Sequence, residues 1–234
     1  CADFLSWSIS KLEKKESIFD AVVGNPPFIR YQYLPKEFQN KSEQIFKLKK
    51  CDFTKHTNAW VPFLISSISL LRNGGRFGMV IPAEIMHVMH ARSLRKFLEN
   101  ECYRIFVIDP QDLWFEGVLQ GAVILLAEKK IKKSQMSKGL IVERVKGKNF
   151  LDKDPEIFFS KNSNKYIRNL DQKWMRAIIS KECNELLTRL KKNKKIKKFS
   201  QIAKVDVGIV TGANKFFLVD DKTIKNYNLK KYAY

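Results

Sequence analysis

The 234-residue sequence is poor in residues and segments that mark several common protein classes. Its four cysteines have spacings that fit neither a disulfide framework nor a zinc site: Cys1, Cys51, Cys102 and Cys183. No cysteine or acidic cluster lies near His87 and His90, so no metal site is expected. No apolar run is long enough to cross a membrane, and no secretory signal opens the chain. We therefore expect no membrane partner and a reducing cytoplasm as the location.

Acidic residues are also scarce, since 24 Asp and Glu stand against 44 Lys and Arg and the net charge is +20. The excess is uneven: residues 1–127 carry a net charge of +3 and residues 128–234 carry +17. The densest basic clusters are 129–133 (KKIKK) and 191–198 (KKNKKIKK). A near-neutral half joined to a strongly basic half suits a protein whose second region binds a polyanion.

The most informative motif is Asn25-Pro26-Pro27-Phe28, which directly follows the apolar run 18–23 (IFDAVV). That run predicts a buried strand of a parallel sheet covered on both faces, and ligands of such sheets bind at the carboxyl ends of the strands. The Asn25 side-chain oxygen and the carbonyls beside the prolines are acceptors, and Phe28 offers a flat face for a base. These features fit an exocyclic amine on a planar ring. The alternative is an ordinary turn made rigid by proline.

Strand and helix patterns alternate on either side of this motif. In chain order they predict a helix at 57–72 stopped by Gly74, a strand at 76–81, a helix at 91–100, and strands at 105–108 and 122–127. Such alternation predicts a parallel α/β sheet. Beyond it, a packed helix is expected to start at Trp174, and residues 202–219 form two β-rich runs around glycine-containing turns.

Residues 19–28 (FDAVVGNPPF) resemble motif IV of the adenine-N6 DNA methyltransferases. Further segments resemble the neighbouring motifs of that family in the same order: 1–5 (CADFL) motif III, 58–64 (NAWVPFL) motif V, 70–82 (LLRNGGRFGMVIP) and 93–98 (SLRKFL) the elements that follow, and 113–117 (LWFEG) with 122–127 motif VIII. The order is that of the gamma class, which includes TaqI-like enzymes and fused restriction-modification proteins. Residues 202–219 resemble the opening of a target-recognition domain.

The resemblance implies a site-specific DNA methyltransferase of a restriction-modification system. It would transfer a methyl group from S-adenosylmethionine to N6 of an adenine flipped out of double-stranded DNA. The motif positions imply that the catalytic residues are Asn25, Pro26, Pro27 and Phe28. They imply that Phe28 and Phe115 stack on the flipped base, and that Asp3, Phe4 and Phe63 bind the cofactor.

The implied fold class is α/β, with the C-terminal part of a Rossmann-like methyltransferase sheet followed by the start of a β-containing target-recognition domain. The expected domains are 1–134, a partial catalytic domain with motifs III to VIII; 135–198, a basic and partly helical connector; and 199–234, the start of target recognition. The glycine-rich cofactor loop that precedes motif III in the family is not found in these residues. A missing N-terminal part of the same protein is therefore an expected partner, and the chain alone is expected to be inactive.

Three other readings compete with this one. The same tetrapeptide occurs in methyltransferases that act on structured RNA or on protein glutamine, and a basic tail is compatible with RNA. A non-catalytic DNA-binding or specificity fragment is the second reading, and the missing cofactor loop favours it. The third is a fusion with a nuclease domain elsewhere in the protein, of which these residues carry no motif.

We expect the isolated chain to bind S-adenosylmethionine weakly or not at all, because the loop that would hold the methionine part is not in the sequence. Calorimetric titration of the isolated chain with the cofactor measures this. Micromolar affinity would contradict the expectation.

Overall fold

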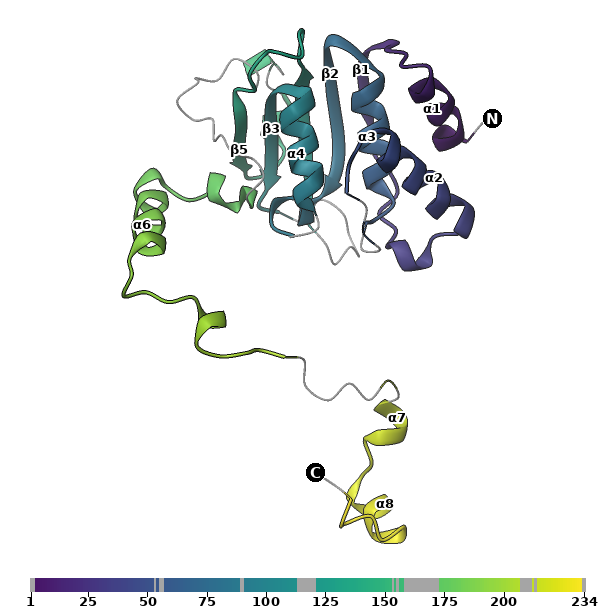
Figure 1. Ribbon diagram of the computed structural model, residues 1–234, viewed down its shortest axis with the longest axis vertical. Coiled ribbons are helices and arrows are strands. Elements are labelled where there is room, and N and C mark those ends of the chain that lie inside the picture. The colour runs from purple at the N-terminus through teal and green to yellow at the C-terminus, as the bar shows by residue number, and fades with distance from the viewer. Residues whose placement is uncertain are drawn as a thin grey trace. The chain divides into compact units, whose positions relative to one another are not determined.

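The computed structural model describes residues 3–52, 54, 57–88, 91–112, 121–152, 154, 156–157, 173–206, 212 and 214–232. These residues divide into two compact units, Cys1–Asn184 and Glu185–Tyr234, and each is described by itself. The first unit has the predicted α/β fold, built on a five-stranded sheet (Figure 1). Over the described part of the chain, no helix is both long and apolar enough to cross a bilayer.

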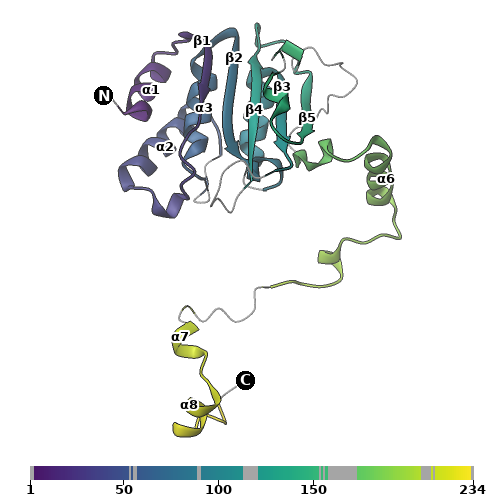
Figure 2. The same cartoon turned by 180° about the vertical axis from the view of Figure 1, so that it is seen from behind.

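The sheet has the strand order β1-β2-β4-β3-β5, seen from its helix-free side in Figure 2. Its strands are β1 (Phe19–Gly24), β2 (Leu71–Pro82), β3 (Cys102–Pro110), β4 (Ala122–Lys129) and β5 (Gly139–Val145). β1 pairs with β2 in parallel, and so does β3 with β5, but β4 runs antiparallel to both of its neighbours. The expected all-parallel sheet is therefore wrong at β4. A parallel return needs a crossover of a dozen or more residues, and the short segment 111–121 leads instead into antiparallel pairing.

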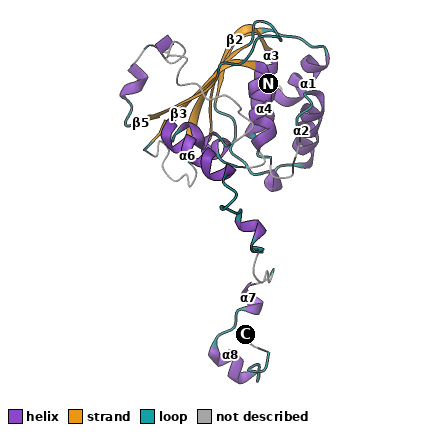
Figure 3. Ribbon diagram, turned by 60° about the vertical axis from the view of Figure 1, so that its left-hand side comes forward, coloured by secondary structure: helices purple, strands orange, loops and turns teal. Residues whose placement is uncertain are grey.

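Four helices lie on one face of the sheet: α1 (Phe4–Glu13), α2 (Lys36–Leu48), α3 (Trp60–Leu70) and α4 (Arg92–Glu101) (Figure 3). α3 and α4 contact the strands, and α1 and α2 pack against α3. The predicted helices at 57–72 and 91–100 are thus confirmed, with their ends shifted by a few residues. α3 is buried almost throughout, because it contacts the sheet, α1, α2 and α4. It is the centre of the main hydrophobic core, with Trp60, Leu64, Ile65 and Ile68 among its members.

β1 is less covered than the sequence suggested. It is the terminal strand of the described sheet, and the side chain of Val23 is 84% exposed. Phe19 and Val22 pack against the main core, whereas Ala21 and Val23 face the side without the four helices. The prediction of a strand buried on both faces is therefore wrong. An apolar sequence run does not by itself report how many layers cover a strand.

The junction of α3 and β2 explains the two consecutive glycines. α3 ends at Leu70 and β2 begins at the next residue, so Gly74 lies within β2 rather than at the helix stop predicted for it. Gly74 has a φ of 76°, which favours glycine. A Cβ atom on Gly75 would lie 2.9 Å from the Arg72 carbonyl oxygen and 3.0 Å from that of Asp20. These glycines let the chain leave the helix and pair with β1 within a few residues.

The carboxyl end of α3 is closed by a buried lysine. Lys129 Nζ donates to the carbonyl oxygens of Ser69 at 2.9 Å and Leu71 at 2.7 Å, and the Ile18 N–H donates to Leu70 O at 2.8 Å. Three carbonyls at the helix end are thereby satisfied. Lys129 is only 9% exposed, and this burial lowers its pKa. The first lysine of the 129–133 cluster therefore has a structural role and is not part of a solvent-facing basic patch.

The region after β4 differs from the sequence prediction in three places. β5 was not predicted and lies inside the range expected to be a connector. Trp174 is buried in the main core, but it begins a short 3-10 turn, Trp174–Ala177, rather than a longer helix. Residues 214–217, expected in a β-rich run, form the helix α7 (Asn214–Phe217). Residues 207–211 of the first β-rich run lie outside the described residues.

The second unit consists of short helices and irregular segments with largely exposed side chains. Its elements are the end of α6 (Lys181–Lys192), a 3-10 turn (Phe199–Gln201), α7 and α8 (Asp221–Asn226). All residues of the basic run 191–198 are exposed. The basic run found in the sequence is thus accessible to solvent.

Replacing Lys129 by Met should lower the free energy of unfolding by about 1–3 kcal/mol, because two buried carbonyls lose their donor. Urea unfolding of the purified chain measures the change. Lys132→Met is the matched control, since Lys132 is exposed, and a surface change of this kind shifts stability by less than about 0.5 kcal/mol. Equal unfolding midpoints for the two variants would contradict the capping role.

Candidate functional site

The Asn25–Phe28 loop leaves the sheet at the carboxyl end of β1, as the sequence predicted. Pro26 is buried, whereas Asn25 and Pro27 are exposed. Phe28 is half-buried and packs against the main core. The loop thus has one proline fixed in the protein and an amide side chain open to a ligand. This arrangement can present acceptors to an amine beside an aromatic ring.

The end of the loop is tied to the start of α3. The N–H of Ala59 donates to the carbonyl oxygen of Ile29 at 2.9 Å. Just beyond, Tyr31 and Leu34 pack on Ala59 in a small cluster of their own, joined by Phe38 of α2. Ile29 is therefore held by the helical layer. The strand before it, β1, pairs only with β2 in the described sheet.

A second polar group lies at the same edge of the sheet, just after β2. Oε1 of Glu84 accepts from Asn58 Nδ2 at 2.5 Å and from Trp60 Nε1 at 3.0 Å. Glu84 was not among the residues predicted for the site. Its position directly after Pro82-Ala83 was the available signal, because a carboxyl group that follows a strand end is placed where ligands of α/β sheets bind.

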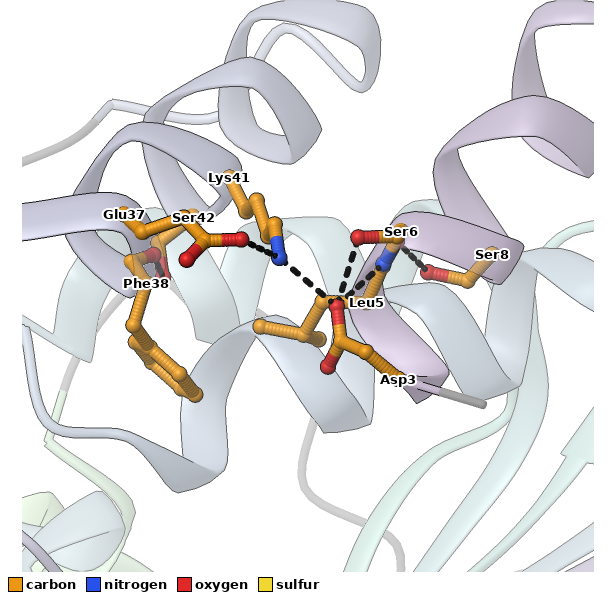
Figure 4. A network of polar contacts seen from close by, with 8 residues as sticks. All are labelled: Asp3, Leu5, Ser6, Ser8, Glu37, Phe38, Lys41 and Ser42. Carbon is orange, nitrogen blue, oxygen red and sulfur yellow. Dashed lines mark hydrogen bonds and ion pairs between the residues drawn. The ribbon is translucent and has the colours of Figure 1, made fainter. Parts of the chain in front are cut away.

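Asp3 caps the start of α1 and is held in a polar network (Figure 4). Its Oδ2 accepts from the Ser6 N–H at 2.9 Å, from Ser6 Oγ at 2.6 Å and from Lys41 Nζ at 3.0 Å. Hydrogen bonds from the Ser6 side chain and backbone, and then from Lys41, hold the pKa of Asp3 well below its usual range. All three contacts converge on one oxygen, and Oδ1 points away from them (Figure 4).

The two aromatic residues predicted for the cofactor site are in contact. The rings of Phe4 and Phe63 stack with centroids 5.4 Å apart and planes 7° apart. Phe38 of α2 lies at 6.2 Å from Phe63, tilted by 35°. Asp3, Phe4 and Phe63 are therefore brought together where α1, α2 and α3 meet, although Phe63 is far from the other two in the sequence.

The loop and this aromatic group are connected through α3. Phe63 is four residues after Ala59, which corresponds to about 6 Å along a helix axis. Since Ala59 is bonded to Ile29, a single helix supports both halves of the candidate site. Phe115, the second predicted base-stacking residue, lies outside the described residues, so its placement stays a prediction. His90, considered above as a possible metal ligand, also lies outside the described residues.

Two family models match the sequence. Residues 2–113 match the Eco57I restriction-modification methylase, and residues 171–234 match the C-terminal domain of the type II methyltransferase M.Eco57I. Together the two segments cover about three quarters of the chain. The first contains all the candidate residues named above except Phe115.

Two curated relatives are similar over nearly the whole chain. The type II methyltransferase M.BstVI of Geobacillus stearothermophilus is 26% identical over 95% of this chain and 41% of its own length. M.AccI of Acinetobacter calcoaceticus is 26% identical over 90% of this chain and 38% of its own length. The chain thus spans about two fifths of the length of these relatives.

Among solved structures, the type IIG restriction endonuclease BpuSI has a similar fold. It matches with a TM-score of 0.50 and 14% identity, over 94% of this chain and 28% of the BpuSI chain. At this identity the likeness concerns the fold alone. Motif order, two family models and two relatives agree, and the chain is similar to Eco57I-type restriction-modification methylases over most of its length.

Proposed function

We propose that the protein containing this chain transfers a methyl group from S-adenosylmethionine to N6 of adenine in double-stranded DNA, as the modification activity of a restriction-modification system. The observation that carries the proposal is the Asn25–Phe28 loop at the carboxyl end of β1, with its end fixed to α3 by the Ala59–Ile29 hydrogen bond. The similarity to known proteins supports it, since the matched relatives are named type II methyltransferases.

The proposed chemistry needs acceptors rather than a strong base. The lone pair of adenine N6 is delocalised into the ring, which makes the nitrogen a weak nucleophile. The Asn25 side-chain oxygen and the Pro26 carbonyl would accept the two N6 hydrogens and localise the lone pair. Positive charge develops on N6 as it takes up the methyl group, and the same acceptors stabilise that charge.

Stacking would hold the base while this happens. The target adenine has to leave the duplex, and the cost of unstacking is offset in the pocket. Phe28 would cover one face of the base and Phe115 the other, and such stacking typically contributes about 1–3 kcal/mol per base. Phe28 is suited to this role because its ring is partly buried in the core and partly accessible.

The residues at the junction of α1, α2 and α3 fit a cofactor with an adenine ring. Phe4 and Phe63 offer an aromatic surface, and Oδ1 of Asp3 points away from the contacts that occupy Oδ2. An exocyclic amine could donate to that oxygen while the ring packs on the aromatic side chains. When bound, S-adenosylmethionine supplies a methyl group attached to a positively charged sulfur. We assign Asp3, Phe4 and Phe63 to its adenine end.

We further propose that the basic second half of the chain binds the DNA backbone. The exposed run 191–198 is the main candidate, whereas Lys129 is excluded because its Nζ is buried against α3. A second partner is the remainder of the same protein, because the chain spans about two fifths of its relatives. The exposed side of β1 around Val23 is a surface that such a segment could cover.

A substrate panel tests the class of acceptor. The full-length protein is incubated with labelled S-adenosylmethionine and, in separate reactions, duplex DNA, structured RNA and a glutamine-containing protein mixture. We expect label in duplex DNA, recovered as N6-methyladenine. Label confined to RNA or protein would support the competing methyltransferase readings, and no label in any arm would support a non-catalytic specificity protein.

Asn25→Ala should lower kcat for DNA methylation by at least about 100-fold, because one of the two acceptors for N6 is removed. DNA affinity should remain unchanged, since the basic region is untouched. Asn40→Ala is the matched control, because Asn40 is an exposed asparagine on α2. Retained turnover in Asn25→Ala would refute the catalytic role.

A further inference from the structure

Glu84 joins the two residues that flank Ala59. The same oxygen, Oε1, accepts from Asn58 Nδ2 and from Trp60 Nε1. Asn58 precedes the helix and Trp60 is its first residue. The carboxyl group therefore restrains the chain on both sides of Ala59, whose own N–H is bonded to Ile29.

This restraint reaches the Asn25–Phe28 loop by one more bond. Ile29 directly follows Phe28, so fixing the Ile29 carbonyl fixes the end of the loop. Ala59 is fully buried, which protects its hydrogen bond from exchange with water. A continuous path thus runs from Glu84 through Asn58 and Trp60 to Ala59, and from Ala59 to the loop.

The backbone around Glu84 is itself held by hydrogen bonds. The N–H groups of His87 and Val88 donate to the Glu84 carbonyl oxygen at 3.1 and 3.0 Å. Nη1 of Arg95, on α4, donates to the carbonyl oxygens of Ile85 and Val88 at 3.0 Å each, and Arg95 is 1% exposed. The backbone that carries Glu84 is therefore held by a buried guanidinium from a different element.

The cavity beside Glu84 among the described residues is small. It has a volume of about 20 Å³ and is lined largely by apolar side chains, among them Phe46, Val61 and Leu94. A space of this size holds about one water molecule. Within the described residues, Oε1 of the Glu84 carboxyl group accepts from two protein donors.

We propose that Glu84 is a positioning residue, which acts through Asn58, Trp60 and the Ala59–Ile29 hydrogen bond to fix the acceptors of the Asn25–Phe28 loop. The role in methylation rests on the function proposed above, whereas the restraint of the loop does not. The position of an acceptor matters because a displacement of about 1 Å at a reacting centre can cost roughly 100-fold in rate.

The test compares Glu84→Ala, Glu84→Gln and the control Glu128→Ala in the full-length protein. Glu128 is another half-buried carboxyl group, paired with Arg104 near the other end of the sheet, so its loss reports general destabilisation. Gln keeps a side-chain oxygen that can accept from Asn58 and Trp60, whereas Ala does not. The first readout is amide hydrogen exchange of peptides covering residues 25–34 and 57–60.

In Glu84→Ala we expect exchange in both peptides to rise by about tenfold or more, as for loss of hydrogen bonds to a carboxylate. We expect kcat to fall by roughly 10- to 100-fold with the KM for DNA unchanged, because the loop is displaced and the DNA contacts are not. Glu84→Gln should recover most of both effects, and Glu128→Ala should leave exchange at these residues unchanged.

Unchanged exchange in Glu84→Ala would overturn the inference whatever the enzyme's activity. Raised exchange with unchanged kcat would also overturn it, because the loop would then be restrained by Glu84 without consequence for the reaction. A wild-type protein that does not methylate DNA would refute the proposed function instead, and the exchange data would still decide whether Glu84 restrains the loop.

Discussion

The buried helix α3 is the constraint on which the first unit depends. Its carboxyl end is closed by Lys129 and by the Ile18 N–H, and its start is bonded to Ile29 and restrained by Glu84. Between those ends it packs against the sheet and three other helices. Because a helix is stiff, fixing both ends sets the distance between the sheet, the aromatic group at Phe63 and the loop after β1. The site is held from the helical layer more than from the strand that carries it.

The positively charged side chains of this chain fall into a buried group and an exposed group. The lysines of 191–198 are exposed to solvent. Lys129 and Arg95, in contrast, are buried and donate to backbone carbonyls at helix and loop ends. Counting lysines along the sequence cannot separate these uses, because the distinction depends on whether a carbonyl lies within reach of the side chain. The buried cations contribute to the fold, whereas the exposed ones are those proposed to bind DNA.

The sequence predicted what local patterns determine: the α/β class, α3, most of α4, and the position of Asn25–Phe28 after β1. The assignment of Asp3, Phe4 and Phe63 to a cofactor site stays a prediction, although the structure brings the three residues together. The sequence did not predict the helix at 214–217. It also did not predict the antiparallel direction of β4, the pairing of β5 or the exposure of Val23, because these depend on contacts with distant segments. Glu84 was missed for the same reason, since its partners Asn58 and Trp60 lie more than twenty residues away.

The path from Arg95 to Ile29 has a kinetic consequence for folding. Its bonds join segments around residues 29, 59, 84 and 95, and those from 29 to 59 and from 58 to 84 each close a loop of more than twenty residues. Loop closure carries an entropic cost, and contacts between distant residues slow folding. The individual helices can form early from local contacts, but the loop that bears Asn25 acquires its final geometry only once strand, helix and edge segment have assembled. Its acceptors are therefore a product of the completed fold rather than of the tetrapeptide alone.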